Sequence, residues 1–272
     1  MVPTQLLVFD LDGTLLDSAH RVPSDVRDLL FALREKGIET TLATGRPFAA
    51  VKTFICELEL HLPLITFNGA LVAMPDGQAL ATRHLPLSAA QTILGLLKNT
   101  SAANHLYLYP TDDAFCTDQN GAASELIREK DHMSCRVVDS LSDLLADANC
   151  DPVKMFSIGS RDELERVKTA VQRTEPSVTC VFSEHDMLEF LGQDVNKGTA
   201  LRVLCEQIGI ASESVIAFGD NMNDFEMLQT AGIGVAMATG PAALQETADR
   251  VISDMAGFLR KHLLAVQSLE VL

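Results

Sequence analysis

Residues 5–14 read Gln-Leu-Leu-Val-Phe-Asp-Leu-Asp-Gly-Thr, an apolar run that ends in two closely spaced acids. The four residues Leu6–Phe9 predict a buried strand near the N-terminus. Because side chains alternate along a strand, Asp10 and Asp12 should point the same way while Leu11 points into the core. Two such carboxylates repel each other unless a cation lies between them or one keeps its proton. The stretch therefore indicates a chemical site where this strand ends.

The pattern around this strand predicts a parallel sheet covered by helices. Strands are expected at residues 5–10, 38–43 and 64–67, with helices at 24–36 and from Pro47 between them. This β-α-β-α-β order with largely apolar strands is typical of a parallel sheet with helices on its faces. The same pattern returns after about residue 188, with a helix expected at 199–208, a strand at 215–218 and a helix after Asn223.

Residues 84–187 show a different pattern. They hold more amphipathic strands, expected at 105–109, 153–158 and 177–183, and helices expected at 88–98 and 162–173. Amphipathic strands favour a sheet with one open face. We therefore predict an α/β protein with a Rossmann-like parallel-sheet core formed by residues 1–83 and 188–272, and an inserted α/β domain formed by residues 84–187.

The composition limits the partners and the compartment. The chain has 272 residues, 47% of them hydrophobic, but no apolar run approaches the roughly 18 residues of a membrane span. The N-terminus lacks the charged and apolar regions of a signal peptide and the six cysteines are scattered, so we expect a cytoplasmic protein. The net charge of −16 argues against nucleic acid as a partner. We expect no membrane partner, and either a monomer or a homodimer.

Four short polar stretches lie at the ends of predicted strands or at the start of a predicted helix. Ligands of open parallel sheets bind outside the carboxyl ends of the strands, so these stretches should meet there. The stretches are Asp10-Leu-Asp-Gly-Thr14, Thr44-Gly45-Arg46, Asn196-Lys197-Gly198 and Gly219-Asp220-Asn-Met-Asn223-Asp224.

These residue types suit the chemistry of phosphoryl groups. Mg²⁺ prefers carboxylate and carbonyl oxygens, which Asp10, Asp220 and the backbone of Asp12 could supply. Lys197 offers a phosphate group a positive charge, and the Thr44 hydroxyl offers it a hydrogen bond. Asp10 suits attack on phosphorus to form an aspartyl-phosphate, and Asp12 suits the general acid and then the general base. The glycine spacing excludes an EF-hand loop, and no P-loop motif occurs.

With these motifs, the chain resembles the haloacid dehalogenase (HAD) superfamily of phosphatases, in particular its Cof-type group with a type IIB cap. The four motifs of the family are matched by residues 10–14, Thr44, Lys197 and residues 219–224. Two marks of the group also match, Asn68-Gly69-Ala70 and Met187-Leu-Glu189-Phe190. The resemblance implies a HAD-like core with an inserted cap of type C2B. It also implies Mg²⁺-dependent hydrolysis of a small phosphorylated metabolite, such as a sugar phosphate.

The resemblance implies a role for each matching residue. Asp10 would be the nucleophile and a metal ligand, and Asp12 the acid–base group with its carbonyl on the metal. Asp220 would be the other protein ligand of Mg²⁺, and Asp224 would support the waters of the metal. Thr44 and Lys197 would hold the phosphate, and the residues that line the site or steady its loops would be Arg46, Asn68, Gly69 and Asn223.

Several questions stay open at this point. The chain departs from the family after Met237, where Ala238-Thr239-Gly240 replaces a common Asn-Ala, and at residues 253–257, where a usual Asp-Gly-Val is missing. Phosphoryl transfer to a sugar, as in phosphomutases, and sensing of a phosphorylated metabolite without turnover are the alternatives to hydrolysis. The cap is expected to choose the substrate through residues such as Tyr107, Tyr109, Asp112, Asp113, Glu184 and His185.

Overall fold

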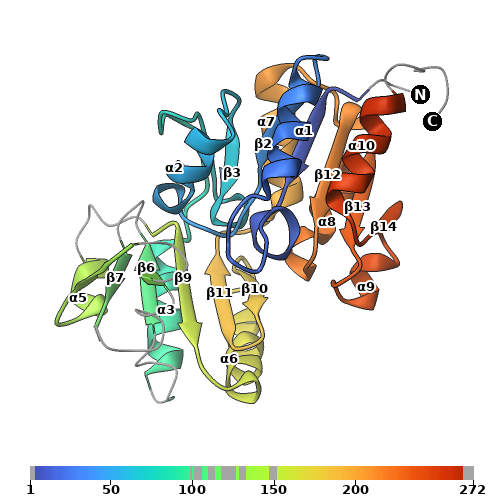
Figure 1. Cartoon of the computed structure of the whole chain (residues 1–272). Coiled ribbons are helices and arrows are strands. Elements are labelled where there is room, and N and C mark those ends of the chain that lie inside the picture. The colour runs from blue at the N-terminus through green and yellow to red at the C-terminus, as the bar shows by residue number, and fades with distance from the viewer. Residues whose placement is uncertain are drawn as a thin grey trace. The chain divides into compact units, whose positions relative to one another are not determined.

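The computed structural model describes residues 4–98, 100, 106–109, 114–117, 127–128, 133–146 and 152–265 (Figure 1). The chain forms two compact units. The first comprises the chain up to Thr44, Lys52–Leu80 and the chain from Asn196, and the second comprises Gly45–Val51 and Ala81–Val195. The second unit thus extends beyond residue 187, where the sequence predicts its end. The roles of the units as catalytic core and cap stay a prediction.

The first unit is built on a five-stranded parallel sheet. Its strand order is β14-β13-β12-β1-β2, and all four pairings are parallel, as the apolar strands predict. The rings of Phe9 and Phe218 stack at 4.5 Å between neighbouring strands. The strands are β1 (Leu6–Phe9), β2 (Glu39–Leu42), β12 (Val215–Gly219), β13 (Ile233–Met237) and β14 (Arg250–Ile252).

Helices cover this sheet. Figure 1 shows α1 (Ser24–Arg34) and α10 (Met255–Ala265) together on the near face, where they pack against each other. Helix α7 (Lys197–Ile208) packs against α8 (Phe225–Thr230). Other helices of the first unit include α9 (Ala242–Gln245) and the short η4 (Ser212–Ser214). The division between the two units falls within α2 (Phe48–Glu57), after Val51.

The strand expected at residues 64–67 has a different partner from the one predicted. The strand β3 (Leu64–Thr66) pairs antiparallel with β4 (Leu71–Ala73), which lies beside β5 (Ala79–Thr82) in a separate three-stranded sheet. A single parallel bridge, between Ala43 and Ile65, joins β3 to the main sheet. The chain reverses at the short helix η2 (Phe67–Gly69), where Phe67, Asn68 and Gly69 all have positive φ angles. This tight reversal makes the following segment an antiparallel partner.

The second unit is a six-stranded sheet with helices packed against it. Its strand order is β10-β11-β9-β6-β7-β8, and only the β7–β8 pair is parallel. Ile93, Leu188 and Phe190 belong to its buried core. The elements are α3 (Leu87–Leu97), β6 (Leu106–Tyr109), β7 (Ala114–Cys116), β8 (Cys135–Val137), α5 (Leu141–Ala146), β9 (Lys154–Ile158), α6 (Arg161–Thr174), β10 (Thr179–Glu184) and β11 (Met187–Leu191).

Strand β11 lies in this second sheet, between β9 and β10, although the sequence assigns residues from 188 onward to the core. Of the residues proposed to select the substrate, Asp112 and Asp113 lie outside the described residues, as do the side chains of Tyr107, Tyr109 and Glu184. Among the described helices, none has both the length and the hydropathy needed to cross a membrane.

Candidate active site

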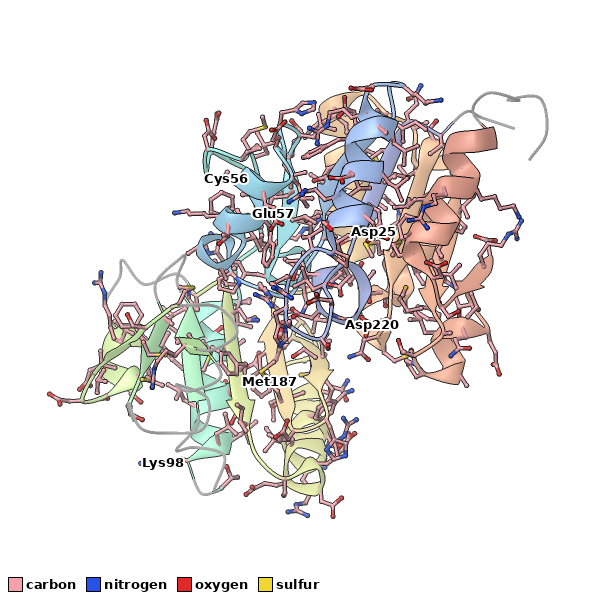
Figure 2. All side chains as sticks on the ribbon, viewed as in Figure 1. Asp25, Cys56, Glu57, Lys98, Met187 and Asp220 are labelled. Atoms are coloured by element: carbon pink, nitrogen blue, oxygen red, sulfur yellow. The ribbon has the colours of Figure 1, made fainter. Side chains whose placement is uncertain are left out.

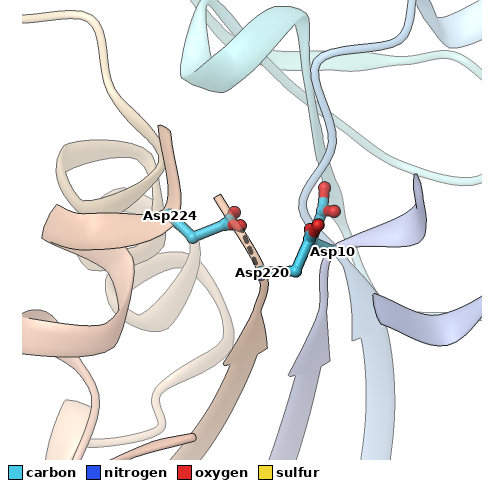
Figure 3. A group of neighbouring side chains, drawn as sticks. All are labelled: Asp10, Asp220 and Asp224. Atoms are coloured by element: carbon cyan, nitrogen blue, oxygen red, sulfur yellow. Dashed lines mark hydrogen bonds between the residues drawn. The ribbon is translucent and has the colours of Figure 1, made fainter. Parts of the chain in front are cut away.

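Three carboxylates from separate parts of the chain meet at the ends of β1 and β12. Asp10 follows the last residue of β1, Asp220 follows the last residue of β12, and Asp224 ends the short helix η5 (Met222–Asp224). One ligand oxygen of each lies within 4.8 Å of the others. Asp220 is labelled on the chain in Figure 2, and Figure 3 shows the three carboxylates together. The strands end at the same edge of the sheet because they are parallel neighbours, and this brings residues 10 and 220 together.

Lys197 is the cation inside this cluster. Its Nζ donates to Oδ1 of Asp10 at 2.5 Å and to Oδ1 of Asp224 at 2.6 Å, and the side chain is completely buried. Burial by itself lowers the pKa of Lys197, but the charges and hydrogen bonds of Asp10 and Asp224 outweigh it and raise that pKa above its ordinary value. Lys197 is therefore a fixed positive charge at neutral pH.

The start of α7 places Lys197 in the cluster. Asn196 caps the helix, since its side chain accepts from the Thr199 backbone N–H at 2.8 Å. The Asn196 backbone N–H in turn points to the Thr199 hydroxyl at 3.4 Å. This reciprocal cap makes Lys197 the first helical residue, two residues before the predicted start of the helix.

Asp224 organises the loop that follows β12. Its Oδ2 accepts from the backbone N–H groups of Asp220 at 2.9 Å and Asn221 at 3.1 Å, while its Oδ1 accepts from Lys197. A Cβ at Gly219 would overlap the Asp224 side chain, so only glycine fits there. Both carboxylate oxygens of Asp224 therefore accept hydrogen bonds from the protein. The bond to the Asp220 backbone N–H fixes the backbone of Asp220.

The turn that follows β1 contacts the carboxylate of Asp220. It is one wide turn over residues 11–15, closed by the Leu16 N–H on the Leu11 carbonyl at 3.0 Å. Gly13 has a φ of +82°, and a Cβ there would overlap the Asp220 carboxylate. Thr14 donates its hydroxyl proton to Asp220 Oδ1 at 3.1 Å. Neither Gly13 nor Thr14 was assigned a role from the sequence, although both belong to the first motif.

Thr44, Asn68, Gly69 and Asn223 form a connected group of loops. The Thr44 carbonyl accepts from the Asn68 N–H at 3.0 Å, and Asn223 Nδ2 donates to Asn68 Oδ1 at 3.0 Å. Asn223 Oδ1 is buried with no hydrogen-bond partner among the described residues, which leaves an acceptor for a ligand or a water. Gly69 has a φ of +103°, and a Cβ there would overlap the Asn196 carbonyl, next to Lys197.

The two other predicted site residues are Asp12 and Arg46. Asp12 is partly exposed, and its Oδ1 lies 3.4 Å from Nδ1 of His20. Arg46 is buried and belongs to the segment Gly45–Val51, which groups with the second unit. The carbonyl of its neighbour Gly45 accepts from Lys154 Nζ at 3.0 Å within that unit.

The turn that departs from the family lies against the Asp220 loop. A Cβ at Gly240 would overlap the Asp220 carbonyl. Gln245 Nε2 donates to the carbonyls of Ala238 at 3.1 Å and Gly240 at 2.7 Å. Gln245 therefore ties residues 238–240 together, and Gly240 packs directly against the backbone of Asp220.

The acidic cluster has more negative than positive charge. Burial, followed by the charge of Asp224, raises the pKa of Asp220 to about 6. Burial also raises the pKa of Asp10 well above its ordinary value, although Lys197 opposes that shift. In the described part of the chain, the Lys197 ammonium bonds two of the three carboxylates, and carboxylate oxygens are the ligand type that Mg²⁺ prefers. The cluster thus fits a divalent cation.

Replacing Asp220 with asparagine should stabilise the metal-free protein at pH 8. The raised pKa means that the folded state holds the proton between about pH 4 and 6 while the unfolded state has lost it, so stability falls as the pH rises through this window. At pH 8 the full penalty is present, and its removal should add on the order of 1–3 kcal/mol. The check is the free energy of unfolding in chelator at pH 8 and pH 4.

Mg²⁺ should then stabilise the wild type and leave Asp220→Asn nearly unchanged. Asp28→Asn is the matched control, because this carboxylate is exposed on α1. A variant less stable than the wild type in chelator at pH 8, with an unchanged gain from Mg²⁺, would contradict this assignment.

Comparisons with known proteins show the family of this chain. The family model of haloacid dehalogenase-like hydrolases matches residues 7–256. An HMP-PP phosphatase of Klebsiella pneumoniae (strain 342) is 34% identical over 243 residues, which cover 89% of this chain and 86% of the relative. An HMP-PP phosphatase of Serratia proteamaculans (strain 568) is also 34% identical, over 236 residues covering 86% of this chain and 83% of the relative.

Solved structures show the same fold. A haloacid dehalogenase-like hydrolase from Bacteroides thetaiotaomicron superposes with a TM-score of 0.83 at 25% identity, over 95% of this chain and 99% of the other. The HAD subclass IIB sugar phosphatase BT4131 superposes with a TM-score of 0.83 at 21% identity, over 95% and 99% of the two chains, and it shows the fold alone. These findings confirm the predicted fold class and the resemblance to HAD phosphatases. The chain belongs to the haloacid dehalogenase-like hydrolase family and is a phosphatase of that superfamily.

Proposed function

We propose that this protein hydrolyses small phosphate monoesters in a Mg²⁺-dependent reaction that passes through an aspartyl-phosphate on Asp10. The observation that carries the proposal is the buried contact of Lys197 with Asp10 and Asp224, beside Asp220. A structural role alone would favour equal numbers of buried charges, because an uncompensated carboxylate is costly inside a protein. An excess of carboxylates at the end of parallel strands fits a cation and an anionic substrate better.

We assign the metal to Asp10, Asp220 and the backbone carbonyl of Asp12, with Asp224 supporting its waters through the loop that it organises. When bound, Mg²⁺ supplies charge that neutralises the phosphoryl oxygens. Carboxylates close together are tolerable in that state, since each has a cation beside it.

Asp10 and Asp12 are proposed to perform the two steps, which form and then hydrolyse the aspartyl-phosphate. Lys197 holds Oδ1 of Asp10, so we assign attack on phosphorus to Oδ2. As the new oxygen–phosphorus bond forms, the bond to the leaving oxygen breaks, and Asp12 gives that oxygen a proton. Water then attacks the phosphorus and loses a proton to Asp12, and the bond to Asp10 breaks. Inorganic phosphate leaves, and both carboxyl groups return to their starting states.

The other polar residues are proposed to bind the phosphoryl group. Lys197 offers a point charge and Thr44 a hydroxyl, as their positions in the motifs imply. Asn223 is proposed to line the site beside them: its Nδ2 donates to Asn68, and its buried Oδ1, without a partner among the described residues, offers an acceptor to a bound water or to a hydroxyl group of the substrate. Arg46 and Gly69 complete the proposed set. Residues 84–187 are proposed to act as a cap that selects the leaving group, and the cytoplasm stays the predicted compartment.

Two substrate classes are proposed. The acidic residues in the predicted cap favour a substrate with a single phosphate, such as a sugar phosphate. HMP-PP is the second candidate, because the relatives named HMP-PP phosphatase are up to 34% identical to this chain. The two classes are distinguished by comparing kcat/KM for each.

Release of inorganic phosphate tests the proposal. The full chain is assayed on sugar phosphates, pyridoxal phosphate, flavin mononucleotide, nucleotides and HMP-PP, with Mg²⁺ and with chelator. We expect turnover of at least one ester that requires Mg²⁺ and uses water as the acceptor. Transfer to a sugar without phosphate release would instead support a phosphomutase, and binding of an ester without turnover would support a sensor.

A further inference from the structure

A histidine that the motifs do not include faces the proposed acid–base residue. Nδ1 of His20 lies 3.4 Å from Oδ1 of Asp12, and the two side chains are 62% and 23% exposed. Both residues belong to the first unit, and eight positions in the chain separate them. The contact is therefore made by the loop that follows the first motif.

Hydrogen bonds within residues 17–21 hold that loop in a defined turn. Oδ1 of Asp17 accepts from the backbone N–H groups of Ala19 at 2.8 Å and Arg21 at 3.0 Å. The backbone N–H of Asp17 donates to the Arg21 carbonyl at 2.9 Å, and that of His20 donates to the Asp17 carbonyl at 2.9 Å. The N–H groups of Arg21 and Ala19 hold the pKa of Asp17 below its usual range, so its carboxylate keeps the turn closed at neutral pH.

The backbone of His20 has a conformation that favours other residues. Its φ is +54°, in the left-handed region that glycine and asparagine adopt more readily than histidine. Residues whose backbone has such a strained conformation are often found at functional sites, where a specific contact compensates for the strain. From this position the His20 side chain approaches Asp12.

We propose that His20 is a positioning residue that orients the Asp12 carboxyl group for proton transfer to the leaving oxygen. This inference rests on the proposed function. An acid–base residue works best when a third group fixes its orientation, as in other catalytic constellations. The imidazole lies beside Oδ1, so we assign the proton transfer to the second oxygen of Asp12. Precise orientation matters most for esters whose leaving oxygen needs a proton.

Comparing kcat/KM for esters with different leaving groups therefore tests the role of His20. The parameter kcat/KM reports the step that breaks the ester bond, provided that this step is irreversible. For an alkyl phosphate, whose leaving oxygen needs the proton, His20→Gly should lower kcat/KM roughly 10-fold, a part of the 10²–10⁴-fold that acid–base catalysis contributes. For p-nitrophenyl phosphate, whose leaving group is stable as the anion, the loss should be less than about 2-fold.

Glycine suits the left-handed backbone, so a loss in His20→Gly reflects the missing side chain and not a strained loop. His20→Asn tolerates the same backbone and offers an amide donor near Asp12, and it should recover most of the activity on the alkyl phosphate. The matched control is His61→Gly, which removes a second half-exposed imidazole beside a carboxylate, 3.2 Å from Glu39. It should leave both values of kcat/KM unchanged.

Equal losses on both esters, or no loss in His20→Gly, would overturn the positioning role while wild-type turnover upholds the proposed function. A variant His20→Asn that is as slow as His20→Gly on the alkyl phosphate would also overturn it. Absence of wild-type turnover would overturn the proposed function, and the role of His20 with it.

Discussion

Replacing Asp10 with asparagine is expected to abolish phosphate release, with kcat lowered at least ~10⁴-fold. Asparagine has the shape of aspartate and can still accept a hydrogen bond from Lys197, so the cluster should stay assembled. It lacks the anionic oxygen that attacks phosphorus, and no other residue is proposed to replace it. Phosphate release on the best ester of the panel, measured for the wild type and Asp10→Asn side by side, checks the expectation.

The control for this variant is Asp28→Asn, an exposed carboxylate on α1 that should keep wild-type turnover. Thermal unfolding of both variants shows whether the fold is retained. A folded Asp10→Asn protein that retains more than about a hundredth of the wild-type kcat would contradict the nucleophile role.

The second large effect is on stability. Replacing Lys197 with methionine should lower the free energy of unfolding by about 3–5 kcal/mol at pH 8, because it leaves two buried carboxylates without their cation. Methionine has a similar length and is apolar, so loss of packing is small. Turnover should also disappear, since the proposed phosphate ligand is gone. Denaturant unfolding of the full chain in chelator is the measurement.

The pH dependence identifies the cause of this loss. Burial raises the pKa of Asp10 and Lys197 opposes that shift, so in the variant the pKa of Asp10 should rise further. The folded state then binds a proton that the unfolded state has lost, and the deficit should shrink as the pH falls towards 5. In the wild type the raised pKa of Lys197 gives stability that is present at all pH values below its unfolded pKa and disappears only at higher pH.

Lys36→Met is the control, because Lys36 is exposed just after α1. It should change stability by less than about 0.5 kcal/mol. A loss in Lys197→Met that is the same at pH 5 and pH 8 would show that packing, and not the unpaired carboxylates, is responsible.

The parallel sheet could be predicted because its strands are apolar throughout. Leu6–Phe9 is buried at every position, and so is Val215–Gly219. Periodicity also located α6 and α7 to within two residues of their starts. The hairpin of β3 and β4 could not be predicted in the same way, because each strand has only three residues and the reversal depends on left-handed backbone at residues 67–69.

Some features of the candidate site could likewise be predicted from the sequence, and others could not. The motifs placed Asp10, Lys197 and Asp220 at one edge of the sheet, as residues that follow parallel strands or open a helix must be. They could not show that Lys197 bonds both Asp10 and Asp224, since these contacts join residues 187 and 27 positions apart. His20 was missed for another reason. Its place opposite Asp12 depends on a turn closed by Asp17 and Arg21, and a histidine within such a turn has no motif of its own.

The most direct test of the central claim is to find the phosphoryl group on Asp10. Asp12→Asn is mixed with p-nitrophenyl phosphate and Mg²⁺, quenched in acid within the first turnover, and digested for mass spectrometry. The leaving group needs little protonation but the second step needs Asp12, so we predict that a phosphoryl group accumulates on the peptide containing Asp10. Turnover by the wild type with no phosphoryl group on Asp10 in the trapped variant, or with one on a different residue, would contradict the account.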